Sequence, residues 1–177
     1  MDLNIIIMSA IIIAICILPF VILSRNSKRK KKRIKSILSD IAKTKSGEIG
    51  AYEICGNLAV GITQEDEAFV FYNKKEDDTE LKSCILLDQF KKCNFIKTSS
   101  SSGSGSIGKL ILEFEHLDKN QSDVSFEFFN SSENFQMGGE LELVEKWKPI
   151  IDKAINTQKA ARQSAQSQNN SIKKAAV

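Results

Sequence analysis

The sequence contains few of the residues from which metal sites and catalytic centres are usually built. Its 177 residues include one histidine and four cysteines, and no two cysteines form a C-x-x-C pair. A zinc site needs about four ligands at set spacings. No G-x-S-x-G nucleophile elbow occurs, and His116 lies in an alternating segment where a structural role is expected. We therefore predict a non-enzymatic protein without metal or cofactor.

Charge is absent from the segment Leu3 to Leu23, in which only Asn4 and Ser9 are polar. A helix of this length covers roughly 30 Å, the hydrocarbon thickness of a bilayer. A buried core helix would show a polar face, and this segment shows none. We predict that residues 1–24 form a transmembrane anchor in the lipid bilayer, with residues 3–23 as the span.

A cleaved signal peptide is the alternative interpretation of this segment. Such a peptide has a basic start and a small-residue cleavage site. Here the start, Met1-Asp2, is acidic, and no A-x-A-like site follows the apolar run. Cys16 lies inside the run and not just after it, as a lipoprotein signal would require. We favour an uncleaved signal-anchor.

A basic run follows the apolar segment directly. It consists of Arg25, Lys28, Arg29, Lys30, Lys31, Lys32, Arg33 and Lys35. Lys and Arg next to a membrane helix stay in the cytoplasm, so we predict a single-pass protein of the cell membrane with its N-terminus outside and its C-terminal domain cytoplasmic. The run is expected to contact anionic lipid headgroups; beside a membrane, nucleic-acid binding is not expected.

The middle of the chain is acidic. Residues 36–158 include 13 lysines and 21 acidic residues. Such a surface is a poor ligand for phosphate backbones or anionic lipids, which favours a protein or peptide partner. The predicted cytoplasmic domain contains three cysteines, Cys55, Cys84 and Cys93. An odd number of cysteines in this compartment argues against a disulfide framework.

The periodicity of the sequence changes along the chain. Residues 25–46 combine the basic run with a helical pattern of apolar residues from Ile34 to Thr44, and we predict an amphipathic stalk. Alternating β-branched and aromatic runs separated by turn residues follow, and predict seven strands of a small antiparallel barrel or sandwich. The predicted strands are Tyr52–Cys55, Leu58–Thr63, Ala68–Tyr72, Leu81–Leu87, Lys91–Thr98, Lys109–His116 and Val124–Phe129.

One helix is expected after the strands, over Gly139 to Ile155, where apolar residues recur at helical spacing. Pro149 predicts a kink near Glu145 to Pro149, or two shorter helices. The polar residues 157–177 predict a largely disordered tail after a frayed helical extension through Gln163. The fold class is therefore α+β.

Seven strands closed by a helix that carries the only tryptophan, Trp147, resemble the pleckstrin-homology (PH-like) superfold. The resemblance covers Gly47 to Ile155 and gives a predicted domain of residues 47–156. In that family the tryptophan packs into the mouth of a half-open barrel, and lipid-binding members carry basic residues in the first hairpin turn. Here that turn is Gly56-Asn57, so the resemblance implies an interaction module and not a phosphoinositide site.

Ser99 to Gly108 contain a G-x-G-x-x-G spacing at Gly103, Gly105 and Gly108. A dinucleotide site would need a helix directly after it, but the following residues alternate like a strand, which favours a flexible hairpin loop.

Two functions from different classes fit these features. The first is a binding or scaffolding protein that acts through a cytoplasmic PH-like domain. The second is a structural or assembly subunit of a membrane complex that acts through its transmembrane helix. The anchor contains only a few of the small residues that mark tight membrane-helix contacts, Ser9, Ala10, Ala14 and Cys16, which favours the first.

Overall fold

The computed structural model describes most of the chain. The described ranges are 3–45, 47–75, 77–100, 106–134 and 136–175. Most side chains before residue 27, and those after residue 164, lie outside the described part. The chain divides into two compact units, Met1–Ile37 and Leu38–Val177, and each is described by itself.

The described part of the first unit is helical and belongs to helix α1 (Leu3–Lys43). The last turns of this helix, from Leu38 onward, belong to the second unit. The predicted anchor and the predicted stalk thus form one continuous helix. Over the residues that are described, no helix is both long and apolar enough to cross a membrane. Nearly all side chains of the predicted anchor, residues 1–24, lie outside the described residues, so the anchor stays a prediction.

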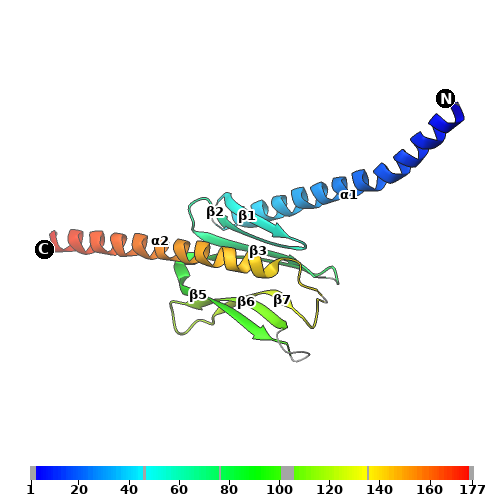
Figure 1. Ribbon diagram of the computed structural model, residues 1–177. Helices are drawn as coiled ribbons and strands as arrows, with labels where there is room; N and C mark the ends of the chain where they lie inside the picture. Colours follow the sequence, from blue (N-terminus) through cyan, green and yellow to red (C-terminus); the bar gives the residue numbers. More distant parts are fainter. Residues whose placement is uncertain (1–2, 46, 76, 101–105, 135, 176–177) are drawn as a thin grey trace. The chain divides into compact units, whose positions relative to one another are not determined.

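Over its described residues, the second unit contains seven antiparallel strands in two sheets (Figure 1). The first sheet has the order β1 (Ile49–Cys55), β2 (Leu58–Thr63), β3 (Ala68–Lys74) and β4 (Glu80–Leu86). A short 3-10 turn, η1 (Leu87–Gln89), leads to the second sheet, with the order β5 (Phe90–Ser99), β6 (Ile107–His116) and β7 (Val124–Asn130). Each strand overlaps one that the sequence predicted, and the α+β class with a closing helix is confirmed.

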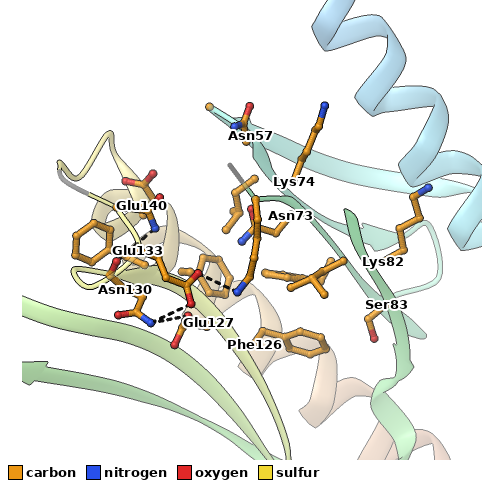
Figure 2. Close-up of a pocket in the computed structure, with 18 of the residues that line it drawn as sticks. Asn57, Asn73, Lys74, Lys82, Ser83, Phe126, Glu127, Asn130, Glu133 and Glu140 are labelled. Carbon is orange, nitrogen blue, oxygen red and sulfur yellow. Dashed lines mark hydrogen bonds and ion pairs between the residues drawn. The ribbon is translucent and has the colours of Figure 1, made fainter. Parts of the chain in front are cut away.

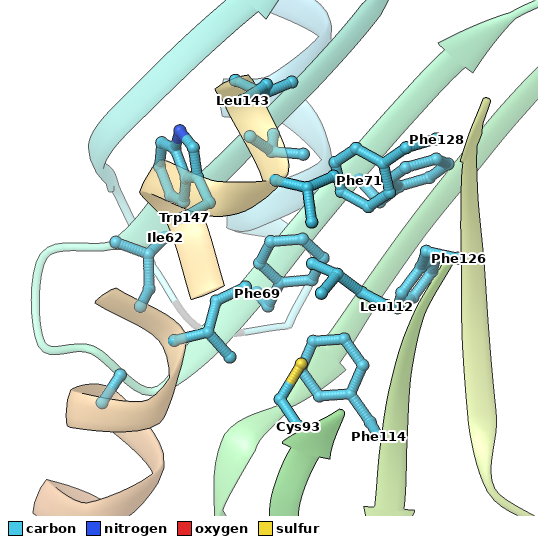
Figure 3. Close-up of a cluster of buried hydrophobic side chains, with 14 of the residues drawn as sticks. Ile62, Phe69, Phe71, Cys93, Leu112, Phe114, Phe126, Phe128, Leu143 and Trp147 are labelled. Carbon is cyan, nitrogen blue, oxygen red and sulfur yellow. The ribbon is translucent and has the colours of Figure 1, made fainter. Parts of the chain in front are cut away.

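Alternating apolar residues from both sheets form the main core, part of which is drawn in Figure 3. Phe69 of β3 lies 5.3 Å from Phe114 of β6, measured between ring centroids. Phe71 of β3 lies 4.8 Å from Phe126 of β7. Aromatic pairs at such distances stabilise a core beyond the area they bury, so these contacts hold the two sheets face to face.

The predicted alternation of β7 is broken at one point. Phe126 opposes Leu112 of β6, but the register shifts between Leu110 and Ile111, so that Phe129 opposes Leu110. A β-bulge places an extra residue on one strand, and both Phe128 and Phe129 are buried here.

The outer face of the first sheet is also buried. Ala59, Val70 and Tyr72 are at most 2% exposed and do not belong to the main core. Leu38 and Ala42, in the last turns of α1, are fully buried as well. The second compact unit begins within the last turns of α1, at Leu38, and the start of the PH-like domain at Gly47 stays a prediction.

The closing helix, α2 (Glu140–Ala175), packs mainly on β5 and η1. Its buried stripe includes Val144, Trp147 and Ile151. It runs through Pro149 as one helix and not as two. It also continues over residues 157–175, where we predicted a largely disordered tail; the many Ala, Gln and Lys residues there are good helix formers.

Substitution of Phe114 should strongly destabilise the second unit. Phe114 is fully buried and its ring contacts Phe69, Phe90 and Phe126. We expect Phe114→Ala to lower the free energy of unfolding by about 3–5 kcal/mol, because it leaves a cavity. Urea unfolding followed by the fluorescence of Trp147 measures this. Leu117→Ala, at a residue that is 42% exposed, is the control and should change the free energy by less than about 0.5 kcal/mol; equal losses would contradict the assigned core.

Candidate functional site

A cleft with a volume of about 940 Å³ opens between the two sheets. Its walls come from β3 and β4 on one side and from β7 on the other, and we name it the β4–β7 cleft (Figure 2). In the described sheets β4 and β7 are both outermost strands, so each presents an edge that its own sheet does not pair. This volume is at the upper end of the range of about 300–1,000 Å³ that is typical of ligand pockets.

The floor of the cleft is apolar. It is lined by the rings of Phe71, Phe126 and Phe128. The Phe71 ring contacts the other two, and the three rings form the end of the aromatic core that faces the cleft. Strand pairing aligns Leu81 with Asn73 and Ser83 with Phe71, so both β4 side chains lie on the inner face of their sheet. Leu81 is nevertheless 43% exposed, because the cleft lies beside it.

Charged side chains surround the apolar floor. The β3–β4 wall contributes Lys74, Lys75, Asp77 and Lys82, and the wall formed by β7 and the segment that follows it contributes Glu127, Glu133 and Glu140. The Nζ atom of Lys75 donates to Glu133 Oε2 at 2.9 Å, which joins the end of β3 to the segment after β7. This hydrogen bond raises the pKa of the lysine. Exposed ion pairs of this kind contribute little to stability, so a ligand could displace the contact at low cost.

The acidic wall is held in place by the turn after β7. Asn130 is 7% exposed, and its Nδ2 atom donates to Glu127 Oε1 at 3.2 Å and to Glu133 Oε1 at 3.5 Å. Glu127 also accepts from Lys109 Nζ at 3.0 Å. The buried amide therefore fixes both carboxylates in position beside the cleft.

Trp147, which carries the fold resemblance, is 2% exposed and belongs to the main core. Its indole Nε1 donates to Glu53 Oε2 at 2.9 Å, and Lys146 Nζ lies 2.8 Å from the same oxygen. The hydrogen bond from Lys146, with a smaller contribution from Trp147, holds the pKa of Glu53 below its ordinary value of 4.5. Glu53 thus ties β1 to α2, and Trp147 has a structural role.

The predicted headgroup-contact residues lie on α1. The side chains of Lys28, Arg29, Lys30, Lys31, Lys32, Arg33 and Lys35 are exposed, and that of Arg25 lies outside the described residues. The residues that line the cleft belong to the second unit, whereas the basic run belongs to the first. Contact with lipid headgroups stays a prediction for this run.

Several other predicted features also have a place in the fold. Gly103 and Gly105 lie outside the described residues, and Gly108 is in β6, so a strand and not a helix follows the glycine spacing. The His116 ring lies 5.1 Å from the Phe90 ring and packs edge-on against it.

The cysteines Cys84 and Cys93 are buried, and burial raises the pKa of Cys93 to about 12. Among the described residues, no group of three or more His, Cys, Asp or Glu side chains is arranged to hold a metal ion.

The cleft itself was missed by sequence reasoning. Its lining comes from the β1–β2 turn, β3, β4, β7 and the start of α2, and no linear motif marks it. The one local signal is Leu81, an apolar residue on the inner face of β4 that stays exposed.

The arrangement of two sheets and a closing helix is consistent with a PH-like fold. The chain matches no protein family, no curated protein and no solved structure with which it was compared.

The hydrogen bonds that Glu53 accepts from Lys146 and from Trp147 predict a specific pH dependence. A carboxylate with a lowered pKa in the folded state stabilises the fold above its ordinary pKa of 4.5, and this contribution is lost as the pH falls through the lowered value. Glu53→Gln should therefore be less stable than the wild type at neutral pH, and the difference should shrink below pH 4.5. Urea unfolding followed by circular dichroism measures it, with Glu145→Gln, at an exposed acid of α2, as the control. A difference that does not change with pH would contradict this role.

Proposed function

We propose that this chain is a single-pass membrane protein whose cytoplasmic PH-like domain is a non-enzymatic binding module. The observation that carries the proposal is the β4–β7 cleft, in which an apolar floor lies between the edges of two outermost strands and is surrounded by charged side chains. Concave sites with an apolar lining and a few polar groups are the usual places where proteins bind ligands. The aromatic core continues directly into the floor of the cleft, so the floor is formed by closely packed rings.

The role of the N-terminal part follows from the sequence. The apolar segment 3–23 would insert into the bilayer, and the basic run after it would keep the domain on the cytoplasmic side. Anchoring confines the domain to a thin layer beside the membrane and raises its effective concentration toward partners in that layer. The cleft would then recruit a protein partner to the membrane.

A single introduced cysteine tests the topology. Ser122 is exposed in the β6–β7 turn, and we would introduce Ser122→Cys after replacing Cys16 and Cys55, keeping the buried Cys84 and Cys93. We expect labelling by a membrane-impermeant maleimide only after cell lysis. The same protein without Ser122→Cys is the control. Labelling of intact cells would place the domain outside and contradict the predicted orientation.

Replacement of the predicted anchor helix distinguishes this proposal from the alternative, in which the anchor helix itself assembles a membrane complex. Residues 3–23 would be replaced by a generic apolar helix, and partners would be captured by chemical cross-linking in intact cells. We expect the same partners to be captured as with the wild type, because the domain makes the contact. Loss of the partners with correct membrane insertion would show that the anchor helix is the binding element.

A further inference from the structure

The lining of the β4–β7 cleft indicates the shape of its ligand. Every residue of the continuous segment 125–130, nearly all of β7, lines the cleft, and β7 is an outermost strand among the strands that the structure describes. A strand of this length spans roughly 17–20 Å, which suits an extended chain better than a small metabolite. The unpaired backbone groups of an outermost strand are a template for an added strand.

The pairing of β7 with β6 defines which side chains of an extended ligand would point into the cleft and which would lie on the outer face of the second sheet. Phe126 pairs with Leu112 on the inner face of the second sheet, and Ser125 pairs with Glu113 on the outer face. Successive residues of a strand point to opposite faces. In a chain added along β7, every second side chain would therefore point into the cleft, toward Phe71, Phe126 and the exposed Leu81.

The other side chains of the added chain would lie on the outer face beside β7. Glu127 lies there, opposite Ile111, and is partly exposed. Its ion pair with Lys109 is also partly exposed, so a basic side chain of the ligand can share or replace it. Opposite charges on neighbouring strands stabilise a pair, and like charges destabilise it. The acidic excess of residues 36–158 acts in the same direction, because it attracts basic partners over longer distances.

We propose that the β4–β7 cleft binds an extended peptide segment of a partner protein that adds to the edge of β7 and alternates apolar with basic residues. The apolar side chains enter the cleft between the two sheets, and the basic side chains lie beside Glu127. Strand addition supplies affinity through main-chain hydrogen bonds, and the alternate side chains supply specificity. This inference rests on the proposed function and adds the partner class to it.

The test uses the full-length chain in mild detergent and a phage library of random linear peptides. We expect enriched peptides to share a consensus in which apolar residues alternate with Lys or Arg. The affinity of a synthetic consensus peptide, measured by fluorescence anisotropy, should fall as the salt concentration rises. A library that enriches no peptide, or a consensus that is acidic or has helical spacing, would overturn the proposal.

Two matched pairs of variants locate the binding. Glu127→Gln and Glu115→Gln each remove one acid of the second sheet, so the net charge of the chain changes equally. Glu127 is ion-paired with Lys109, and Glu115 is ion-paired with Lys91 and Lys92. Leu81→Ser and Leu117→Ser each remove a leucine that is 43% or 42% exposed. We expect Glu127→Gln and Leu81→Ser to weaken binding roughly five- to tenfold, and Glu115→Gln and Leu117→Ser to leave it unchanged. Equal losses within either pair would overturn the proposal.

Failure of this inference is distinguishable from failure of the proposed function. If cross-linking in cells still captures partners, and Leu81→Ser does not reduce their yield, the protein is a binding module that uses another surface. If neither the library nor the cells yield a partner, both proposals fail.

Discussion

The contact between phenylalanine rings of opposite sheets is the interaction on which the rest of the structure depends. Phe69 and Phe71 belong to the first sheet, and Phe114 and Phe126 belong to the second. Their ring centroids lie 4.8 to 5.6 Å apart, and they are all at most 5% exposed. Without this layer neither sheet would have a partner for its apolar face, and α2 would have no core to close.

The cleft lies where this aromatic layer ends. Alongside Phe71, the first sheet offers Ser83, whose side chain is too small to cover the rings. Helix α2 packs mainly on β5 and η1, so its apolar stripe is used elsewhere in the unit. The rings of Phe71 and Phe126 therefore serve two purposes, because they hold the sheets together and form the floor of a candidate binding site.

Much of the fold could be predicted from the sequence, because period-2 patterns and turn residues are local signals. The alternation in the predicted strand Lys109–His116 and the position of Trp147 are such signals, and Leu110, Phe114 and Trp147 are buried. The register shift in β7 could not be predicted, since it depends on pairing with β6. Nor could the cleft, because Leu81 and Phe126 are distant in the sequence and line the same cleft only after both sheets form. The helix over residues 157–175 was missed because polar composition was interpreted as disorder, although several of these residues favour helices.

The measurement that tests the central claim most directly is site-specific photocross-linking in living cells. A photoreactive phenylalanine analogue would replace Leu81 inside the cleft or, in a separate variant, the equally exposed Leu117 outside it. The account predicts a light-dependent adduct with a partner protein from position 81 and none of that size from position 117. The same adduct from both positions, or an adduct from position 117 alone, would contradict the claim that the β4–β7 cleft is the binding surface of this protein.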